Sequence, residues 1–230
     1  MKLVAQTAKV LSMSDIQPAV QPVATARSQR ARLPFAARPV VPLLLAGFAA
    51  LSAVAFGLST GDTALDGWRL ATRYTARVAA VVFLLVFVTG PIWRGFRAGW
   101  IAPFMRNRRY WGLGFALAHI IHLGALTTFF IVSPEDPSLI TILGGGLAYV
   151  LIVAMAATSN NWSQRTLGPW WHRLHMVGMI YIWIIFAQSY AGRLEDPESI
   201  WTGIFGSSLF AAAMLLRIGV RLTAQMRSQS

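Results

Sequence analysis

Long apolar segments recur at regular intervals along the chain from about residue 40 onward. They cover residues 40–59, 72–93, 110–132, 139–157, 170–190 and 200–217. A helix needs about 20 apolar residues to cross the ~30 Å hydrocarbon core of a bilayer. Transmembrane strands would be shorter and would alternate apolar with polar residues, which these segments do not. The pattern predicts an all-α integral membrane protein, a six-helix transmembrane bundle.

Composition supports lipid as part of the solvent. Of the 230 residues, 56% are apolar and only 12% are charged, whereas a soluble domain carries about 25% charged residues. Mean hydropathy is +0.55. The chain has no cysteine, which excludes disulfides, thiolate metal sites, iron–sulfur clusters and haem attached through cysteine.

The two ends of the chain differ from its middle. Residues 1–38 contain prolines, serines and arginines but no apolar run long enough to pack, which predicts a flexible basic tail. Residues 39–220 are predicted to form one transmembrane domain, and 221–230 a short basic tail. Residues 1–38 also lack the apolar stretch and cleavage site of an ordinary signal peptide.

Charges sort between alternate connecting loops. Seven of the eight acidic residues lie in the stretches 60–71, 133–138 and 191–199, while the other loops and both tails are rich in arginine. Basic loops remain on the cytoplasmic side of a membrane. The distribution therefore predicts that both termini are cytoplasmic, and membrane orientation explains the net charge of +12 better than nucleic-acid binding does.

All four histidines lie in two of the predicted spans. His119 and His122 belong to the third span, and His172 and His175 to the fifth. The spacing of each pair places both members on one helix face, and the two odd-numbered spans run parallel. Ionisable groups within lipid are usually functional, and two imidazoles from facing helices suit the iron of a b-type haem. Hydrogen bonding across the bundle, or a four-histidine copper, zinc or iron site, are the alternatives.

Residue types alone leave the ligand pair open. The depth of each histidine along its span can be estimated from the 1.5 Å rise per helical residue. By this estimate the depth of His119 matches that of His175 better than the depth of His122 does. Arg77, a few residues into the second span, would either pair with a haem propionate or extend to the membrane surface.

Several stretches resemble the ferric-reductase-like transmembrane domain family, over roughly residues 60–215. Within it, the chain is most similar to haem-binding membrane subunits of the MsrQ or YedZ type. The resembling stretches are 74–77, 89–91, RRYWGLGFALAHIIH at 108–122, TS at 158–159 and LGPWWHRLH at 167–175.

This resemblance implies that His122 and His175 are the axial ligands of one haem b near the cytoplasmic side, with His119 and His172 beside them. Family members often carry one more histidine in the fifth span, where this chain has Gln188, so no outer bis-histidine haem is expected. The resemblance also implies a bacterial inner (plasma) membrane location.

The leading hypothesis is an electron-transfer subunit of an oxidoreductase system. The sequence has no glycine-rich nucleotide-binding motif that follows a predicted strand, so this chain would receive its electrons from another molecule. The candidate donors are a cytosolic flavin reductase and a membrane quinol. The electrons would pass through haem to a redox protein on the outer side. The alternatives are a non-redox transporter or assembly factor that uses a four-histidine site, and a self-contained ferric reductase.

Overall fold

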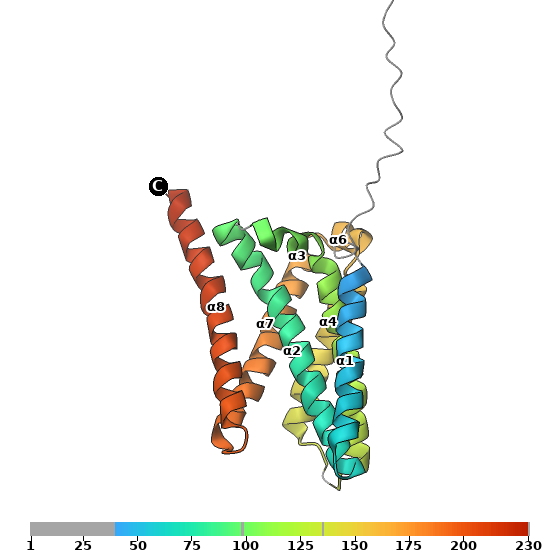
Figure 1. Ribbon diagram of the computed structural model, residues 1–230. Coiled ribbons are helices and arrows are strands. Elements are labelled where there is room, and N and C mark those ends of the chain that lie inside the picture. The colour runs from blue at the N-terminus through green and yellow to red at the C-terminus, as the bar shows by residue number, and fades with distance from the viewer. Residues whose placement is uncertain (1–39, 98, 135, 230) are drawn as a thin grey trace, which may run out of the picture. The chain divides into compact units, whose positions relative to one another are not determined.

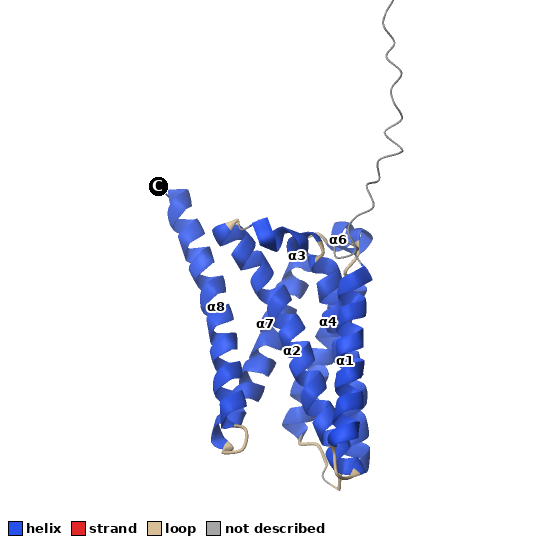
Figure 2. Ribbon diagram, viewed as in Figure 1, coloured by secondary structure: helices blue, strands red, loops and turns tan. Residues whose placement is uncertain are grey.

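The computed structural model describes residues 40–97, 99–134 and 136–229. Every regular element in these residues is a helix (Figure 2). The all-α fold class predicted from the apolar pattern is therefore confirmed for this part of the chain. The predicted basic tail at 1–38 lies outside the described residues.

Eight α-helices form the described fold (Figure 1). Three short 3₁₀ or π turns join them: Gly99–Ile101 before α3, Thr141–Gly145 before α5 and Gly192–Glu195 after α7. The helices are α1 Val40–Thr60, α2 Ala64–Phe96, α3 Ala102–Arg106, α4 Arg108–Val132, α5 Gly146–Ala157, α6 Asn161–Leu167, α7 Pro169–Ala191 and α8 Ile200–Gln229.

Five helices are individually long and apolar enough to cross a membrane: α1, α2, α4, α7 and α8. The fourth predicted span is different, because the helical stretches Thr141–Ala157 and Asn161–Leu167 meet at a bend of 105°. The count is six spans if this bent pair crosses once. The structure thus supports five to six apolar spans where the sequence pattern predicted six.

Two helices extend beyond the apolar runs that predicted them. Helix α2 begins at Ala64, because the Thr63 side chain caps it by accepting a hydrogen bond from the Asp66 backbone nitrogen at 3.1 Å. Helix α8 continues to Gln229, so residues 221–229 form its last turns and do not leave the helix. Hydropathy marks only the apolar part of a helix, and capping and polar faces carry it further.

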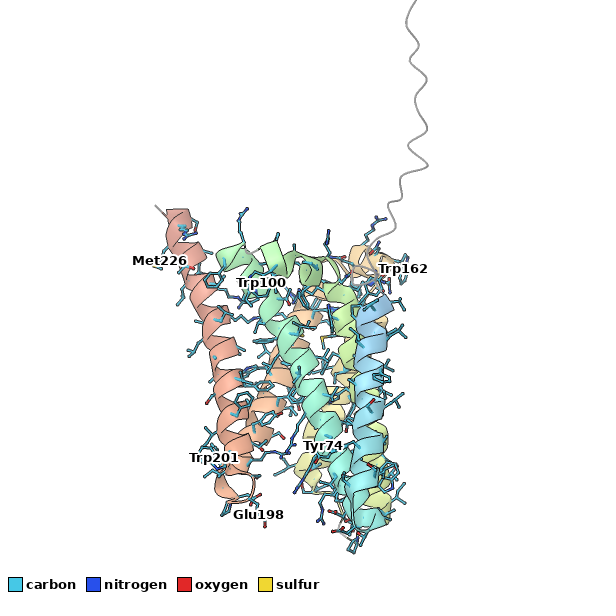
Figure 3. The ribbon with its side chains drawn as sticks, viewed as in Figure 1. Tyr74, Trp100, Trp162, Glu198, Trp201 and Met226 are labelled. Carbon is cyan, nitrogen blue, oxygen red and sulfur yellow. The ribbon has the colours of Figure 1, made fainter. Side chains whose placement is uncertain are left out.

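The two ends of the helical unit carry opposite charges. Helices α2 and α8 end, and α4 and α7 begin, at the end where Figure 1 shows α3 and α6. We call this the arginine-rich end, after Arg94, Arg108, Arg109, Arg217 and Arg221. The opposite, acidic end contains Asp62, Asp66, Asp196 and Glu198. Figure 3 places Trp100, Trp162 and Met226 at the arginine-rich end, and Trp201 and Glu198 at the acidic end.

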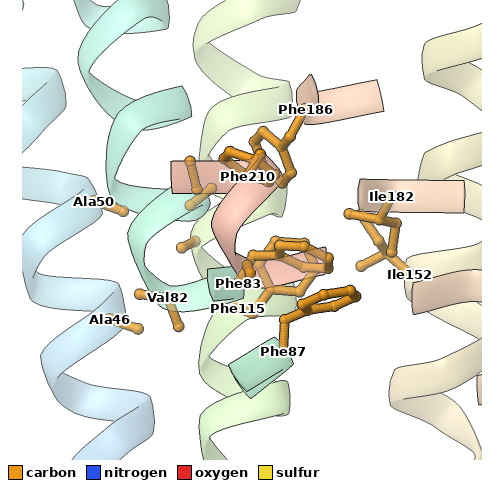
Figure 4. Packing of buried hydrophobic residues seen from close by; sticks show 14 of the residues in the cluster. Ala46, Ala50, Val82, Phe83, Phe87, Phe115, Ile152, Ile182, Phe186 and Phe210 are labelled. Atoms are coloured by element: carbon orange, nitrogen blue, oxygen red, sulfur yellow. The ribbon is translucent and has the colours of Figure 1, made fainter. Parts of the chain in front are cut away.

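A cluster of phenylalanines fills the space between α2, α4, α7 and α8 (Figure 4). Phe83 is at its centre, with ring centroids 5.4 Å from those of Phe115 and Phe186 and 6.2 Å from that of Phe210. Such ring pairs contribute roughly 0.5–1.5 kcal/mol beyond their buried area. The cluster closes the inner end of the cavity described below.

Helices α1 and α2 approach each other closely where two glycines permit it. A Cβ added at Gly57 would overlap the backbone nitrogen of Ala71, and one at Gly61 would overlap that of Gly67. Small residues allow this kind of helix contact in membranes, where apolar burial alone does not drive association. The close contact positions α2, which carries one wall of the candidate site.

Candidate cofactor cavity

A cavity of about 600 Å³ opens among the helices at the arginine-rich end. This volume lies in the range of cofactor and small-molecule sites, roughly 300–1,000 Å³. Its walls come from α2, α4, α5, α7 and α8, and α3 and α6 contribute residues at its rim. The apolar part includes Phe83, Phe115, Ile152, Met155 and Met179, and the charged part comprises Arg94, Arg108, Arg109, Arg173, Arg217 and Arg221.

His175 lies on the α7 wall of this cavity. Its Nδ1 is 3.0 Å from the backbone carbonyl oxygen of Trp171. A carbonyl oxygen only accepts, so Nδ1 carries the proton and Nε2 keeps its lone pair. Nε2 is buried and has no hydrogen-bond partner. Buried polar atoms are nearly always partnered, so this nitrogen is a candidate ligand atom.

The tryptophan beside His175 fixes the imidazole from a second direction. The two rings stack, with centroids 4.0 Å apart and planes at 27°. The indole Nε1 of Trp171 donates a 2.9 Å hydrogen bond to the Thr158 carbonyl oxygen, at the end of α5. Both hydrogen bonds and the stacking therefore hold His175 in one orientation.

The other histidine of α7, His172, also lines the cavity, but its side chain is exposed. Its ring meets that of Trp171 edge-on, with centroids 5.1 Å apart. An exposed imidazole of this kind suits the cavity entrance, whereas the half-buried His175 belongs to the wall.

The two α4 histidines are not among the lining residues. His119 is only 8% exposed, and its ring packs against those of Phe115, Tyr149 and Phe186 with centroids 5.0–5.8 Å apart. Its Nδ1 is buried without a hydrogen-bond partner. Phe115 both lines the cavity and contacts His119, so this phenyl ring separates the histidine from the cavity.

His122 is anchored to α2. Its Nδ1 is 3.0 Å from the hydroxyl oxygen of Thr75, which donates to the Ala71 carbonyl oxygen at 2.7 Å. Since the hydroxyl proton is used there, the imidazole donates from Nδ1 and its Nε2 keeps the lone pair. His122 and His175 thus share one feature, an anchored Nδ1. Iron-ligating histidines are commonly held in this way by a partner outside the metal's own ligands.

The structure brings His172 and His175 to one cavity and leaves His119 and His122 outside its lining. The pairing of His122 with His175 on one iron stays a prediction. Among the described residues, which include all four histidines, no group of three or more His, Asp or Glu side chains is arranged to hold a metal ion. The four-histidine metal site is therefore not assembled.

Arg77 does not line the cavity. Its guanidinium carbon lies 5.4 Å from the Tyr74 ring centroid, and its Nε is buried without a partner. It precedes Phe83, the first lining residue of α2, and helical rise separates the two by roughly 9 Å. A role for Arg77 at a haem propionate therefore stays a prediction, and its side chain is not part of the cavity lining.

Sequence reasoning missed the six lining arginines as site residues. It attributed the basic clusters to membrane orientation, and no pattern within one helix indicated that arginines of four different helices, α2, α4, α7 and α8, meet at one cavity. The Arg217–Arg221 spacing, one helical turn past an apolar run, was the available signal. Two of these arginines reach inward: Nε of Arg108 and of Arg217 is buried without a partner, and Arg217 lies over the Phe87 ring at 4.6 Å.

Among the described residues, no aspartate or glutamate lines the cavity. Six arginines around one space repel one another, and that repulsion is strongest where the surroundings exclude water. The arrangement is therefore suited to a ligand that is apolar at one end and negatively charged at the other. No family model and no solved structure matches the chain.

Proposed function

We propose that the chain is a membrane protein that binds a b-type haem at this cavity and transfers electrons through it. The observation that carries the proposal is the buried, unpartnered Nε2 of His175 on the cavity wall, with Nδ1 held by the Trp171 carbonyl. An imidazole fixed in this tautomer is a strong iron ligand.

The cavity also fits the rest of a haem. Its apolar walls suit a flat macrocycle, and Arg108 and Arg217, which line the cavity and have a buried, unpartnered Nε, would hold the two propionates. Arginine pairs with carboxylates through two parallel hydrogen bonds. Haem supplies one-electron redox chemistry when bound.

The chain's own residues would have separate roles at this site. His175 would bind, Trp171 would orient the imidazole, and the phenylalanine cluster would exclude water from the inner end. The second axial ligand remains the predicted His122. Its side chain does not line the cavity, so this pairing would require the α4 side chains beside the cavity to rearrange.

The arginine-rich end would face the cytoplasm, because basic segments remain inside. The electron donor would then be a cytosolic flavoprotein or a quinol, and the acceptor a redox protein at the acidic end. Under this proposal the protein belongs to the bacterial inner membrane and to the ferric-reductase-like class that its histidine and tryptophan segments resemble.

Optical spectra of the purified full-length protein test the proposal. We expect protein from haem-replete cells to show a reducible b-type Soret band. His175→Ala should lose this band, and His172→Ala, which changes an exposed histidine of the same cavity, should keep it. A colourless parent protein would contradict the proposal, and so would a His175→Ala variant with the parent spectrum.

A further inference from the structure

The cavity has more positive charge than a haem would neutralise. Six arginines line it, and haem has two propionates. The other four, Arg94, Arg109, Arg173 and Arg221, remain without an acidic neighbour among the described lining residues. Membrane orientation requires basic residues at this end but does not require them to converge on one space. Their convergence indicates a second anionic group.

Arg173 joins the cavity to an apolar groove. The groove is lined by Leu167, Trp170, Leu174 and Val177, and Arg173 belongs to the lining of both features. The Arg173 guanidinium carbon lies 4.7 Å from the Trp170 ring centroid. Trp170 and Val177 are 67% and 56% exposed, so the groove is open on the outer face of α7.

We propose that this rim and groove bind an anionic phospholipid of the leaflet that meets the arginine-rich end. The phosphate would lie at Arg173 and the rim arginines, and one acyl chain would lie along the groove. Basic pockets between membrane helices suit such head groups. A soluble phosphate would leave the adjoining groove of four apolar side chains unused. The inference does not require haem to be bound.

Native mass spectrometry of the full-length protein, with phosphatidylglycerol or phosphatidylcholine added, tests this proposal. We expect phosphatidylglycerol to be retained preferentially, and Arg173→Gln to reduce its binding about fivefold, as expected for one arginine at an anionic surface. Arg106→Gln, at an exposed arginine of the same end outside both linings, should retain the preference. Equal binding of both lipids, or equal losses in the two variants, would overturn the proposal.

A second variant and a competitor identify the occupant. Trp170→Ala keeps every charge but opens the groove, and we expect it to weaken phosphatidylglycerol binding; unchanged binding would overturn the acyl-chain assignment. Inorganic phosphate should displace the lipid no better than chloride does at the same ionic strength. Stronger displacement by phosphate would overturn the lipid in favour of a soluble anion. Haem content, read from the same samples, tests the proposed function separately.

Discussion

The imidazole of His175 stacks on the indole of Trp171 with ring centroids 4.0 Å apart, and its Nδ1 lies 3.0 Å from the carbonyl oxygen of the same residue. One tryptophan thus contributes a ring face and a backbone acceptor to a single histidine. Its own Nε1 is bonded to the Thr158 carbonyl oxygen. The orientation of the candidate ligand therefore depends on the end of another helix, α5.

Trp171→Phe tests this dependence. The variant keeps an aromatic face but loses the hydrogen bond to Thr158, so we expect weaker haem retention, by roughly the 10–100-fold typical of lost supporting contacts. The control is Trp183→Phe, which loses a comparable 3.0 Å bond to the Phe210 carbonyl oxygen outside the cavity lining. Both variants should lose about 1 kcal/mol of stability. Equal haem retention in the two would contradict the role assigned to Trp171.

Thr75→Val removes the acceptor of His122 Nδ1 with little change of shape. If His122 ligates iron, loss of this hydrogen bond makes its imidazole a weaker electron-pair donor to the metal. We therefore expect the haem midpoint potential to rise. Thr89→Val is the matched control, because that buried hydroxyl bonds only within its own helix, to the Leu85 carbonyl oxygen. If a potentiometric titration gives the same midpoint potential for the two variants, His122 is not an iron ligand.

Alanine variants of the α4 histidines separate the two candidate ligands. We expect His122→Ala to convert a six-coordinate, low-spin spectrum to a five-coordinate one, because its anchored Nδ1 resembles that of His175. His119→Ala should keep the low-spin spectrum and lose only packing against Phe115 and Tyr149. The opposite result would assign the ligand to His119.

Arg108→Gln is expected to lower haem retention by about tenfold or more, because it removes a propionate partner whose charge-assisted bond contributes roughly 1.5–3 kcal/mol. Arg77→Gln, at an arginine outside the cavity lining, should leave retention unchanged. The rate of haem transfer to apomyoglobin measures haem retention in both variants. Loss in Arg77→Gln alone would restore the propionate role first considered for Arg77.

Gly57→Ala tests the contact between α1 and α2. Its new methyl group would overlap the Ala71 backbone, so we expect destabilisation by about 1–3 kcal/mol. Gly124→Ala, where nothing lies within 4 Å of the added Cβ, should be neutral or stabilising by up to about 1 kcal/mol. Thermal unfolding in detergent compares the two, and similar midpoints would contradict the close contact.

Much of the fold follows from hydropathy because lipid forces the backbone of each span into a helix. The pattern therefore predicted α1, α2, α4, α7 and α8. It did not predict the 105° bend after Ala157, because this bend depends on local contacts such as the cap that Asn160 forms with the Ser163 backbone nitrogen.

The candidate site was less accessible to sequence reasoning. Rarity within apolar spans identified His175, since imidazole is costly in lipid. The phenyl wall at Phe115 and the convergence of Arg108 with Arg217 depend on how α4 and α8 each pack against α2, and no single segment encodes this. The predicted depth match between helices also ignored tilt, which packing determines.

The break after α5 has a mechanical consequence. A straight fourth span would use the Thr158 carbonyl within its own ladder of hydrogen bonds. At the bend this oxygen accepts hydrogen bonds from the Asn160 backbone nitrogen and from the Trp171 indole, and the indole in turn holds the His175 ring. An inserted residue between Thr158 and Asn160 would thus displace the indole and, with it, the imidazole, so the connection between α5 and α6 helps to position His175.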